Sequence, residues 1–268
     1  MFSLLSGDGI RLAVYDYRPD AKKTVLLLHG WPFSHEIFEY QILALTGLGY
    51  RVIAPDFRGF GASDSPVSGY GYDQLASDLY GIVASLNLFS FTLAGFSMGG
   101  AVALRYMRLY GGYGVKKLIL AAAVSPSFVR RPGFPGGIPL SDAEALVQQA
   151  KDDRPALVRR FCQEKLFACP HSQAKKDWLE HIARSASAVG TVQAACALRD
   201  EDGRADLAAV TVPTFLLHGK KDAVAPKETA LTLAEEIPGA RLFWLEQSGH
   251  GIFSDDAAKF NRIFFQCL

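Results

Sequence analysis

Apolar runs along this sequence alternate with amphipathic segments in a regular order. The apolar runs end in glycine or small polar residues, as strands buried within a sheet do. They cover residues 11–17, 23–30, 51–59, 91–97, 116–125, 212–222 and 241–251. Helical periodicity separates them, at about 35–47, 73–86, 98–110, 227–236 and 254–266. This alternation predicts an α/β protein with a mainly parallel sheet covered by helices on both faces, and segment 11–17 as an edge strand.

The alternation stops between about 126 and 205. There the loop VRRPGFPGGIP is rich in proline and glycine, and only helical patterns follow it, near 142–152, 154–167, 174–186 and 189–199. The segment SDAE (141–144) is typical of a capping box that opens the first of these helices. The sequence therefore predicts a core of residues 1–125 and 206–268, with an all-helical cap at 126–205.

Composition adds few constraints. The 268 residues are 49% hydrophobic and 21% charged, as in an ordinary globular protein, and the net charge of +1 favours neither nucleic acid nor a membrane surface as partner. The opening MFSLLSGDGIRLAVYDYRP lacks a basic stretch before a long apolar run, so we expect no signal peptide, no transmembrane segment and a cytoplasmic location. Scattered cysteines without C-x-x-C favour reduced thiols over disulfides or metal ligands.

The segment LAGFSMGGAV places Ser97 between Gly95 and Gly99 in a G-x-S-x-G pattern. An apolar strand precedes it and a helical run follows, which is the setting of a nucleophile elbow. The helix N-terminus behind such a serine supplies free backbone N–H groups and the positive end of a dipole. We therefore interpret Ser97 as a nucleophile; the alternative is a glycine-rich turn with a surface serine.

A serine hydroxyl needs a base to become a good nucleophile. His250 is the best candidate, because it lies in a loop of small residues that follows the last predicted strand. His29 and His218 also end strands, but each precedes a glycine, and we expect them to pack against the backbone of their own turns. The other histidines fall on expected helices, where a surface or packing role is the simpler interpretation: His35, His171 and His181.

A base needs a carboxylate to orient it, and an oxyanion needs donors. Asp222 follows the next-to-last strand and gives the order Ser…Asp…His that this topology expects; its alternative role is to cap the helix after Pro226. The N–H of Met98, next to the nucleophile, and the N–H of Trp31, in LLLHGWPFS, are the predicted oxyanion-hole donors.

Together these motifs resemble the α/β-hydrolase superfamily. HGWP, PDFRGFGASDSP, GFSMGG, HGKKDAVAP and SGHGIF occur in the family's order and span nearly the whole chain. Within it, HGWPFS with GFSMGG is similar to cofactor-free haloperoxidases (perhydrolases) and aryl esterases. The resemblance implies a Ser97–His250–Asp222 triad, an oxyanion hole at Trp31 and Met98, and no metal or organic cofactor.

The predicted reaction is hydrolysis of a small to medium, mainly apolar aryl or alkyl ester through an acyl-enzyme. Pro32 resembles the perhydrolase side of the group, so peracid formation from hydrogen peroxide is an expected side activity. We expect the substrate pocket to be lined by side chains of the cap and by apolar side chains beside the motifs: Trp31, Phe33, Phe96, Ile252 and Phe253.

Two other functions stay open. One is hydrolysis of another bond by the same fold, such as a carbon–carbon bond, a lactone or an amide. The other is a ligand sensor that signals to a protein partner. The sequence also leaves open whether the chain forms homo-oligomers.

Overall fold

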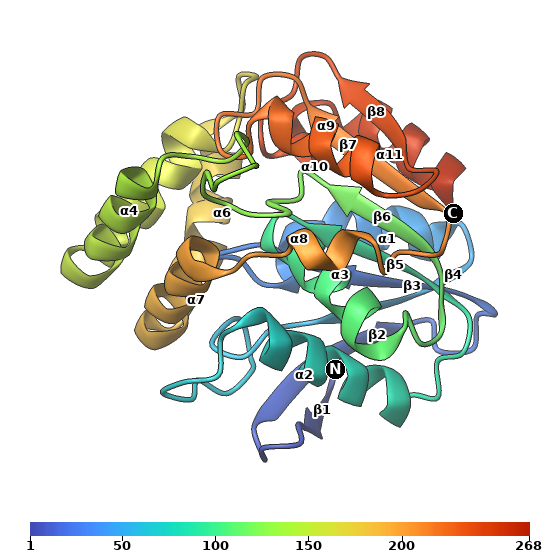
Figure 1. Ribbon diagram of the computed structural model, residues 1–268. Helices are drawn as coiled ribbons and strands as arrows, with labels where there is room; N and C mark the ends of the chain where they lie inside the picture. Colours follow the sequence, from blue (N-terminus) through green and yellow to red (C-terminus); the bar gives the residue numbers. More distant parts are fainter.

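The computed structural model describes residues 1–268 and places one sheet at the centre of the molecule (Figure 1). Its eight strands lie in the order β1-β2-β4-β3-β5-β6-β7-β8. Only β1 and β2 run antiparallel to their neighbours. The strands are β1 (Phe2–Leu5), β2 (Arg11–Tyr17), β3 (Lys23–Leu28), β4 (Tyr50–Pro55), β5 (Phe91–Phe96), β6 (Val115–Ala121), β7 (Thr214–Gly219) and β8 (Arg241–Leu245). The predicted mainly parallel sheet is confirmed.

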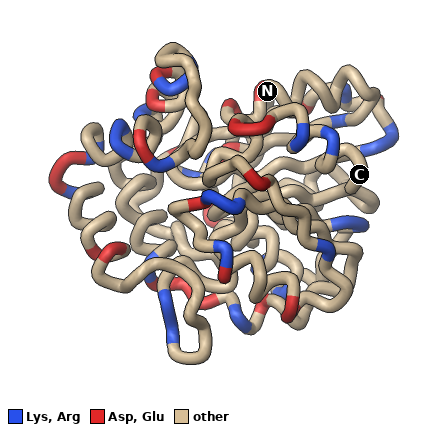
Figure 2. The backbone as a smooth tube through the Cα atoms, turned by 90° about the horizontal axis from the view of Figure 1, so that it is seen from above, with Lys and Arg blue, Asp and Glu red and all other residues tan.

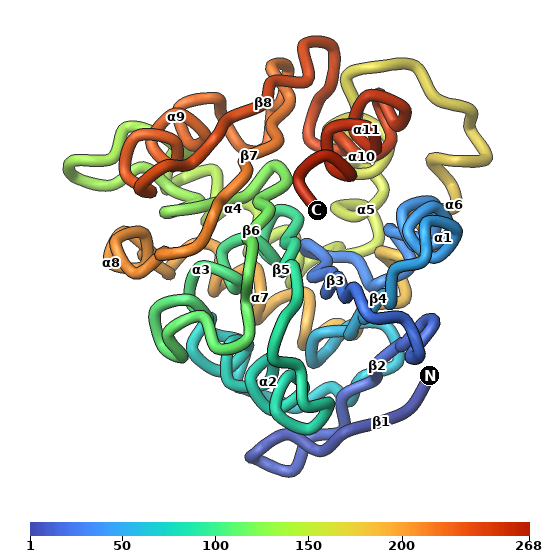
Figure 3. The backbone as a smooth tube through the Cα atoms, turned by 90° about the vertical axis from the view of Figure 1, so that its right-hand side faces the viewer, coloured from blue at the N-terminus to red at the C-terminus, as the bar shows by residue number.

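Helices cover both faces of the sheet, as its apolar strands require. On one face lie α2 (Tyr72–Ser85), α3 (Met98–Tyr110) and α9 (Lys227–Glu236). On the other lie α1 (Glu39–Gly47), which follows the short turn η1 (His35–Phe38), and α11 (Ala257–Cys267). Figure 3 shows α1 and α11 on one side of the strands and α3 on the other. The buried apolar side chains accordingly form two clusters, one beneath each helical layer.

Between β6 and β7 the chain forms a helical cap at one end of the sheet (Figure 1). Its helices are α4 (Leu140–Asp152), α5 (Arg154–Arg160), the π-helical turn η2 (Phe161–Lys165), α6 (Gln173–Ser185), α7 (Ala188–Asp200) and α8 (Arg204–Leu207). The predicted all-helical segment is therefore present. Its exact division from the core, at residues 126 and 205, stays a prediction.

Three local expectations were wrong. Segment 11–17 is not the edge strand, because β1 pairs outside it with Phe2 opposite Val14. The last helix is broken: α10 (Ile252–Asp255) ends before Asp256, whose side chain caps α11 by accepting from the Lys259 N–H at 3.1 Å. Ser141 does not cap α4, which begins one residue earlier and has no side-chain cap. The first error comes from the short strand β1, which the apolar pattern did not reveal, and the other two concern helix ends, where local signals compete with tertiary packing.

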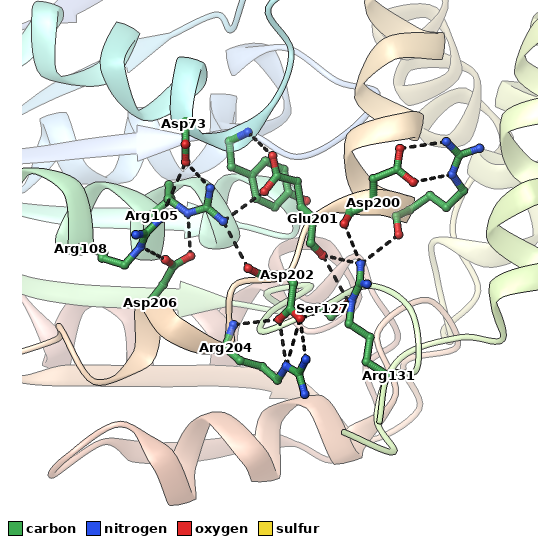
Figure 4. A network of polar contacts seen from close by, with 12 residues as sticks. Asp73, Arg105, Arg108, Ser127, Arg131, Asp200, Glu201, Asp202, Arg204 and Asp206 are labelled. Atoms are coloured by element: carbon green, nitrogen blue, oxygen red, sulfur yellow. Dashed lines mark hydrogen bonds and ion pairs between the residues drawn. The ribbon is translucent and has the colours of Figure 1, made fainter. Parts of the chain in front are cut away.

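A network of charged side chains anchors the cap where it returns to the core (Figure 4). Arg105 of α3 is buried and donates to Asp206 of α8 at 2.9 Å and to Glu201, after α7, at 3.1 Å. Arg131 donates to the carbonyl oxygens of Asp200 and Glu201, at 2.8 and 3.0 Å. These bonds fix the C-terminal end of α7 to helix α3.

Two wider properties bear on partners. Figure 2 shows lysine and arginine interspersed with acidic residues along much of the backbone, in keeping with the net charge of +1. No helix combines the length and the apolar character that crossing a membrane requires.

His29, at the end of β3, is fully buried. Its Nε2 accepts a hydrogen bond from the Phe57 N–H at 3.0 Å, and its Nδ1–H donates to the Gly30 carbonyl at 3.0 Å. This pattern requires a neutral ring, and burial lowers the pKa of His29 to about 4. His218 similarly donates to the carbonyl of Ala225. Both histidines thus hold the backbone of their own turns, as the sequence suggested.

The buried neutral ring of His29 predicts a specific loss of stability in acid. Its folded pKa lies below its unfolded value near 6.5, so the unfolded state takes up a proton first as pH falls. Wild-type unfolding free energy should therefore decline between about pH 6.5 and about pH 4, with this residue contributing up to about 3 kcal/mol. Urea unfolding of wild type and His29→Gln across that range tests it. The wild-type advantage at neutral pH should shrink in acid; a constant difference would contradict the assignment.

Candidate active site

Ser97 occupies a strained turn between β5 and α3. Its backbone has φ 55° and ψ −119°, a region that residues other than glycine rarely adopt. The turn is held by the Ser97 N–H, which donates to the Ala121 carbonyl at 2.9 Å, and by the Gly100 N–H, which donates to the Ser97 carbonyl at 3.0 Å. The strand–turn–helix setting expected from the motif is present.

The motif glycines are required by space. A Cβ at Gly95 would lie 2.4 Å from the carbonyl oxygen of Gly99, and one at Gly99 would lie 2.4 Å from that of Leu28 in β3. Gly30 approaches just as closely, since its Cβ would lie 2.7 Å from the Cβ of Ser97. These contacts let the start of α3 pack directly on β3 and β5, which projects the serine from the sheet.

The structure joins three sequence-predicted residues in one hydrogen-bonded chain. His250 Nε2 lies 2.9 Å from Ser97 Oγ, and His250 Nδ1 lies 2.8 Å from Asp222 Oδ2. The other oxygen of Asp222 accepts from the N–H groups of Val224 and Ala225, each at 2.8 Å. The three side chains come from the loops after β5, β7 and β8, so only the folded sheet brings them together.

The electrostatic setting keeps Asp222 ionised. Its side chain is fully buried, and burial by itself raises the pKa of the carboxyl. The charge and hydrogen bond of His250, followed by His218 and the Ala225 N–H, outweigh that effect and hold the pKa below its ordinary value. Burial lowers the pKa of His218, whose Nε2 lies 3.7 Å from Asp222. A carboxylate at Asp222 fixes the proton of His250 on Nδ1 and leaves Nε2 free to accept one.

Two backbone N–H groups are available beside Ser97. Met98 is the first residue of α3, so its N–H has no partner within the helix. The Trp31 N–H, in the loop after β3, donates to no acceptor within the chain. The indole Nε1–H of Trp31 donates to the carbonyl of Thr191 in α7 at 3.0 Å, so a cap helix holds this side chain in place. These groups are suitable donors for an oxyanion.

A cavity of about 490 Å³ opens in front of Ser97 and His250, between the core and the cap. This volume suits a small organic molecule. Apolar side chains dominate its walls. Most of them come from the cap: Phe128, Ile138, Ala145, Leu146, Leu157, Phe161 and Leu198. The core contributes Trp31, Val124, Ala223 and Val224. Besides Ser97 and His250, the polar part of the wall consists of Gln149 and four charged residues, namely Asp142, Arg160, Glu164 and Lys165.

The predicted lining of this pocket was mostly wrong. Trp31 lines the cavity, but Phe33, Phe96, Ile252 and Phe253 belong to the buried cluster on the α1 and α11 face of the sheet. Phe96 precedes the nucleophile on β5, and successive side chains of a strand point to opposite faces. Its ring instead packs against Phe253 and His250, with centroids 5.0 Å apart in each case. Nearness to a motif in sequence is thus a poor guide to the pocket wall.

Sequence reasoning expected cap side chains in the wall but did not identify which ones form it. Leu146, Leu157 and Phe161 lie on the apolar sides of α4, α5 and η2, and helical periodicity could have marked them as buried. Periodicity does not say whether a buried residue meets another helix or a cavity. No group of histidine, cysteine, aspartate and glutamate side chains has the arrangement of a metal site.

Comparison with known proteins extends these observations. The profile of the Alpha/beta hydrolase family matches residues 25–263. The AB hydrolase superfamily protein YisY of Bacillus subtilis (strain 168) is 41% identical over 248 residues, which is 91% of each chain. The structure of an esterase from Exiguobacterium antarcticum is 42% identical and superposes with a TM-score of 0.96 over 98% of this chain and 97% of that one. A bromoperoxidase from Bacillus anthracis is 33% identical, with a TM-score of 0.92 over 99% of each chain.

The geometry predicts that Ser97 reacts with electrophiles only when Asp222 orients His250. We expect a fluorophosphonate probe to label Ser97 in the wild type, and Asp222→Asn to slow labelling by about 10³–10⁴-fold, because the amide stabilises the wrong histidine tautomer. Mass spectrometry of the labelled peptide measures both.

Asp16→Asn is the control for that experiment. This carboxylate of β2 pairs with Arg51 and touches none of the three residues, so labelling should keep its wild-type rate. Equal labelling of wild type and Asp222→Asn would show that the hydrogen-bonded chain does not activate Ser97.

Proposed function

The chain belongs to the alpha/beta hydrolase family, and we propose that within this family it is a serine carboxylesterase for small to medium, mainly apolar aryl or alkyl esters. The observation that carries the proposal is the 2.9 Å contact between Ser97 Oγ and His250 Nε2. That contact faces an apolar cavity large enough for such an ester. Similarity to the Exiguobacterium antarcticum esterase, at 42% identity, supports the choice of ester chemistry.

In the first half of the reaction, Ser97 Oγ attacks the ester carbonyl carbon as His250 Nε2 takes the hydroxyl proton. The negative charge that develops on the carbonyl oxygen is stabilised by the N–H groups of Met98 and Trp31. Asp222 stabilises the imidazolium across the 2.8 Å contact with Nδ1. His250 then returns the proton to the alkoxide oxygen as the carbon–oxygen bond breaks, and the alcohol leaves.

In the second half, water attacks the acyl carbon of the Ser97 ester. His250 takes one proton from this water and delivers it to Ser97 Oγ as the acyl–serine bond breaks. The products are the carboxylic acid and the free serine. The apolar cap residues around the cavity bind the acyl or alcohol group by burying its surface, at about 25 cal/mol per Å² of apolar area.

Perhydrolysis is the second activity we propose for the same site. Hydrogen peroxide can replace water as the nucleophile that attacks the acyl-enzyme, which releases a peracid in place of the acid. The peracid then oxidises halide in solution, and no metal or organic cofactor takes part. The 33% identity to the Bacillus anthracis bromoperoxidase supports this activity, as does the proline at position 32.

The test is hydrolysis of p-nitrophenyl acetate, butyrate and octanoate by wild type and Ser97→Ala. The wild type should hydrolyse the acetate and butyrate rapidly, and Ser97→Ala should lower kcat by about 10⁶-fold because it removes the nucleophile. Adding hydrogen peroxide and acetate should yield peracetic acid with the wild type alone.

Two other outcomes of this assay would contradict the proposals. Rapid ester hydrolysis without peracid would refute the perhydrolysis proposal and the interpretation of Pro32 as a sign of that activity. Negligible turnover of all three esters would refute the carboxylesterase proposal. The next assays would then use carbon–carbon, lactone and amide substrates, to test hydrolysis of another bond. Capture of a protein partner would test the role of a ligand sensor.

A further inference from the structure

Asp255, five residues after the proposed base, is a buried carboxylate with an unusual set of partners. It ends the short helix α10, and its side chain is fully shielded from solvent. It accepts four hydrogen bonds: from the N–H groups of Gly249 (2.7 Å), Ala168 (2.9 Å) and Cys169 (3.2 Å), and from His171 Nε2 (2.8 Å). No lysine or arginine pairs with it.

These donors come from two separate parts of the chain. Gly249 directly precedes His250 in the loop after β8. Ala168, Cys169 and His171 belong to the cap segment between η2 and α6. Asp255 thus joins the loop that carries His250 to the cap segment 166–171 through one carboxylate.

Backbone packing reinforces this junction. The Gly251 N–H donates to the Leu166 carbonyl at 2.6 Å. A Cβ at Gly249 would lie 2.8 Å from the nitrogen of Ala168, and one at Gly251 would lie 2.7 Å from the ring of Phe167. The glycines on both sides of His250 therefore rest against the cap, with no space between for a side chain.

We propose that Asp255 is a positioning residue for His250. Its carboxylate holds the loop 248–251 against the cap segment 166–171, and this contact keeps His250 Nε2 at the 2.9 Å distance from Ser97 Oγ. The inference rests on the proposed function only for the role of His250 as base. It assigns a task to the second Asp–His pair of this region, Asp255 with His171, which lies outside the cavity wall.

The carboxylate is matched to its four donors. Both of its oxygens accept, two hydrogen bonds each. An asparagine has the same shape, but its NH₂ group would face two N–H donors in place of an acceptor. Asp255→Asn therefore breaks hydrogen bonds between the His250 loop and the cap segment without creating a cavity. It is the substitution that tests the role of the carboxylate most directly.

The experiment measures Ser97 labelling by a fluorophosphonate, together with kcat and KM for p-nitrophenyl butyrate. Asp255→Asn should slow labelling and lower kcat by about 10²-fold, the loss expected when a catalytic group is displaced by about 1 Å, while KM stays within about threefold. A change confined to KM, or unchanged rates in the folded variant, would overturn the proposal.

Asp16→Asn is again the control. Asp16 is also largely buried, and its carboxylate accepts from Arg51 Nε (2.9 Å) and Nη2 (2.6 Å). Neither donor lies in the His250 loop, in the loop of Trp31 or in the cap, so the labelling rate should stay near wild type. A loss equal to that of Asp255→Asn would point to a general effect of removing a buried charge and would overturn the specific role.

His171 provides a rescue test that perturbs the fold less. His171→Ala removes one of the four donors and should slow labelling by about tenfold, whereas His171→Gln retains an N–H donor and should restore most of the rate. If Asp255→Asn does not fold, this pair decides: equal rates in wild type and His171→Ala would overturn the proposal.

The labelling assay separates this inference from the proposed function. Labelling requires Ser97 and His250 but no ester substrate. A wild type that is labelled rapidly yet hydrolyses no ester would refute the carboxylesterase proposal and leave the role of Asp255 measurable. Full ester activity in Asp255→Asn would refute the role of Asp255 and leave the carboxylesterase proposal intact.

Discussion

The site of this protein depends on the close approach of helix α3 to strands β3 and β5. Gly95 and Gly99 permit that approach, because any side chain there would overlap backbone carbonyl oxygens at 2.4 Å. The approach forces Ser97 to a φ of 55° and points its hydroxyl away from the sheet. The same turn leaves the Met98 N–H unpaired and puts the loop of Trp31 within contact of Ser97. Strain at one residue is thus balanced by the packing of the whole sheet.

The cap contributes more than a cover for the cavity. One of its helices, α7, accepts the indole hydrogen bond of Trp31, and its segment 166–171 holds the loop of His250. The Arg105 network fixes the end of α7 to α3, the helix that begins beside Ser97. The side chain of Trp31, the loop of His250 and helix α3 are therefore each bonded directly to the cap. Substitutions in the cap can change the rate of the reaction without touching the substrate.

Buried ionisable groups around the site serve distinct purposes. His29 and His218 are kept neutral by burial and hold backbone turns, whereas Asp222 is kept charged by its donors. The difference lies in their surroundings: burial disfavours the charged form of both rings, and His29 must also accept from the Phe57 N–H, whereas a carboxylate with several donors is stabilised as the anion. His250 is the histidine whose Nε2 meets a hydroxyl in place of a backbone group.

The sequence by itself determined strands β2 to β8 of the sheet, their order along the chain and the candidates Ser97, His250 and Asp222. Those features have local causes: apolar runs make buried strands, and a nucleophile turn demands glycine at fixed spacing. Local signals also placed Trp31 and Met98, because they adjoin the turns that the motifs define.

Only the tertiary structure decided the pocket wall and the partners of Asp255. Phe96 and Phe253 are apolar and adjoin the motifs, but they pack against each other outside the cavity wall. Leu146 and Phe161 line the cavity because the cap folds back over the sheet. Asp255 reads as an ordinary acidic residue near a helix start, yet three of its four donors lie more than eighty residues earlier in the chain. A contact between distant segments does not change the hydrophobic periodicity of either segment. Such contacts therefore become known only from the packing of the folded chain.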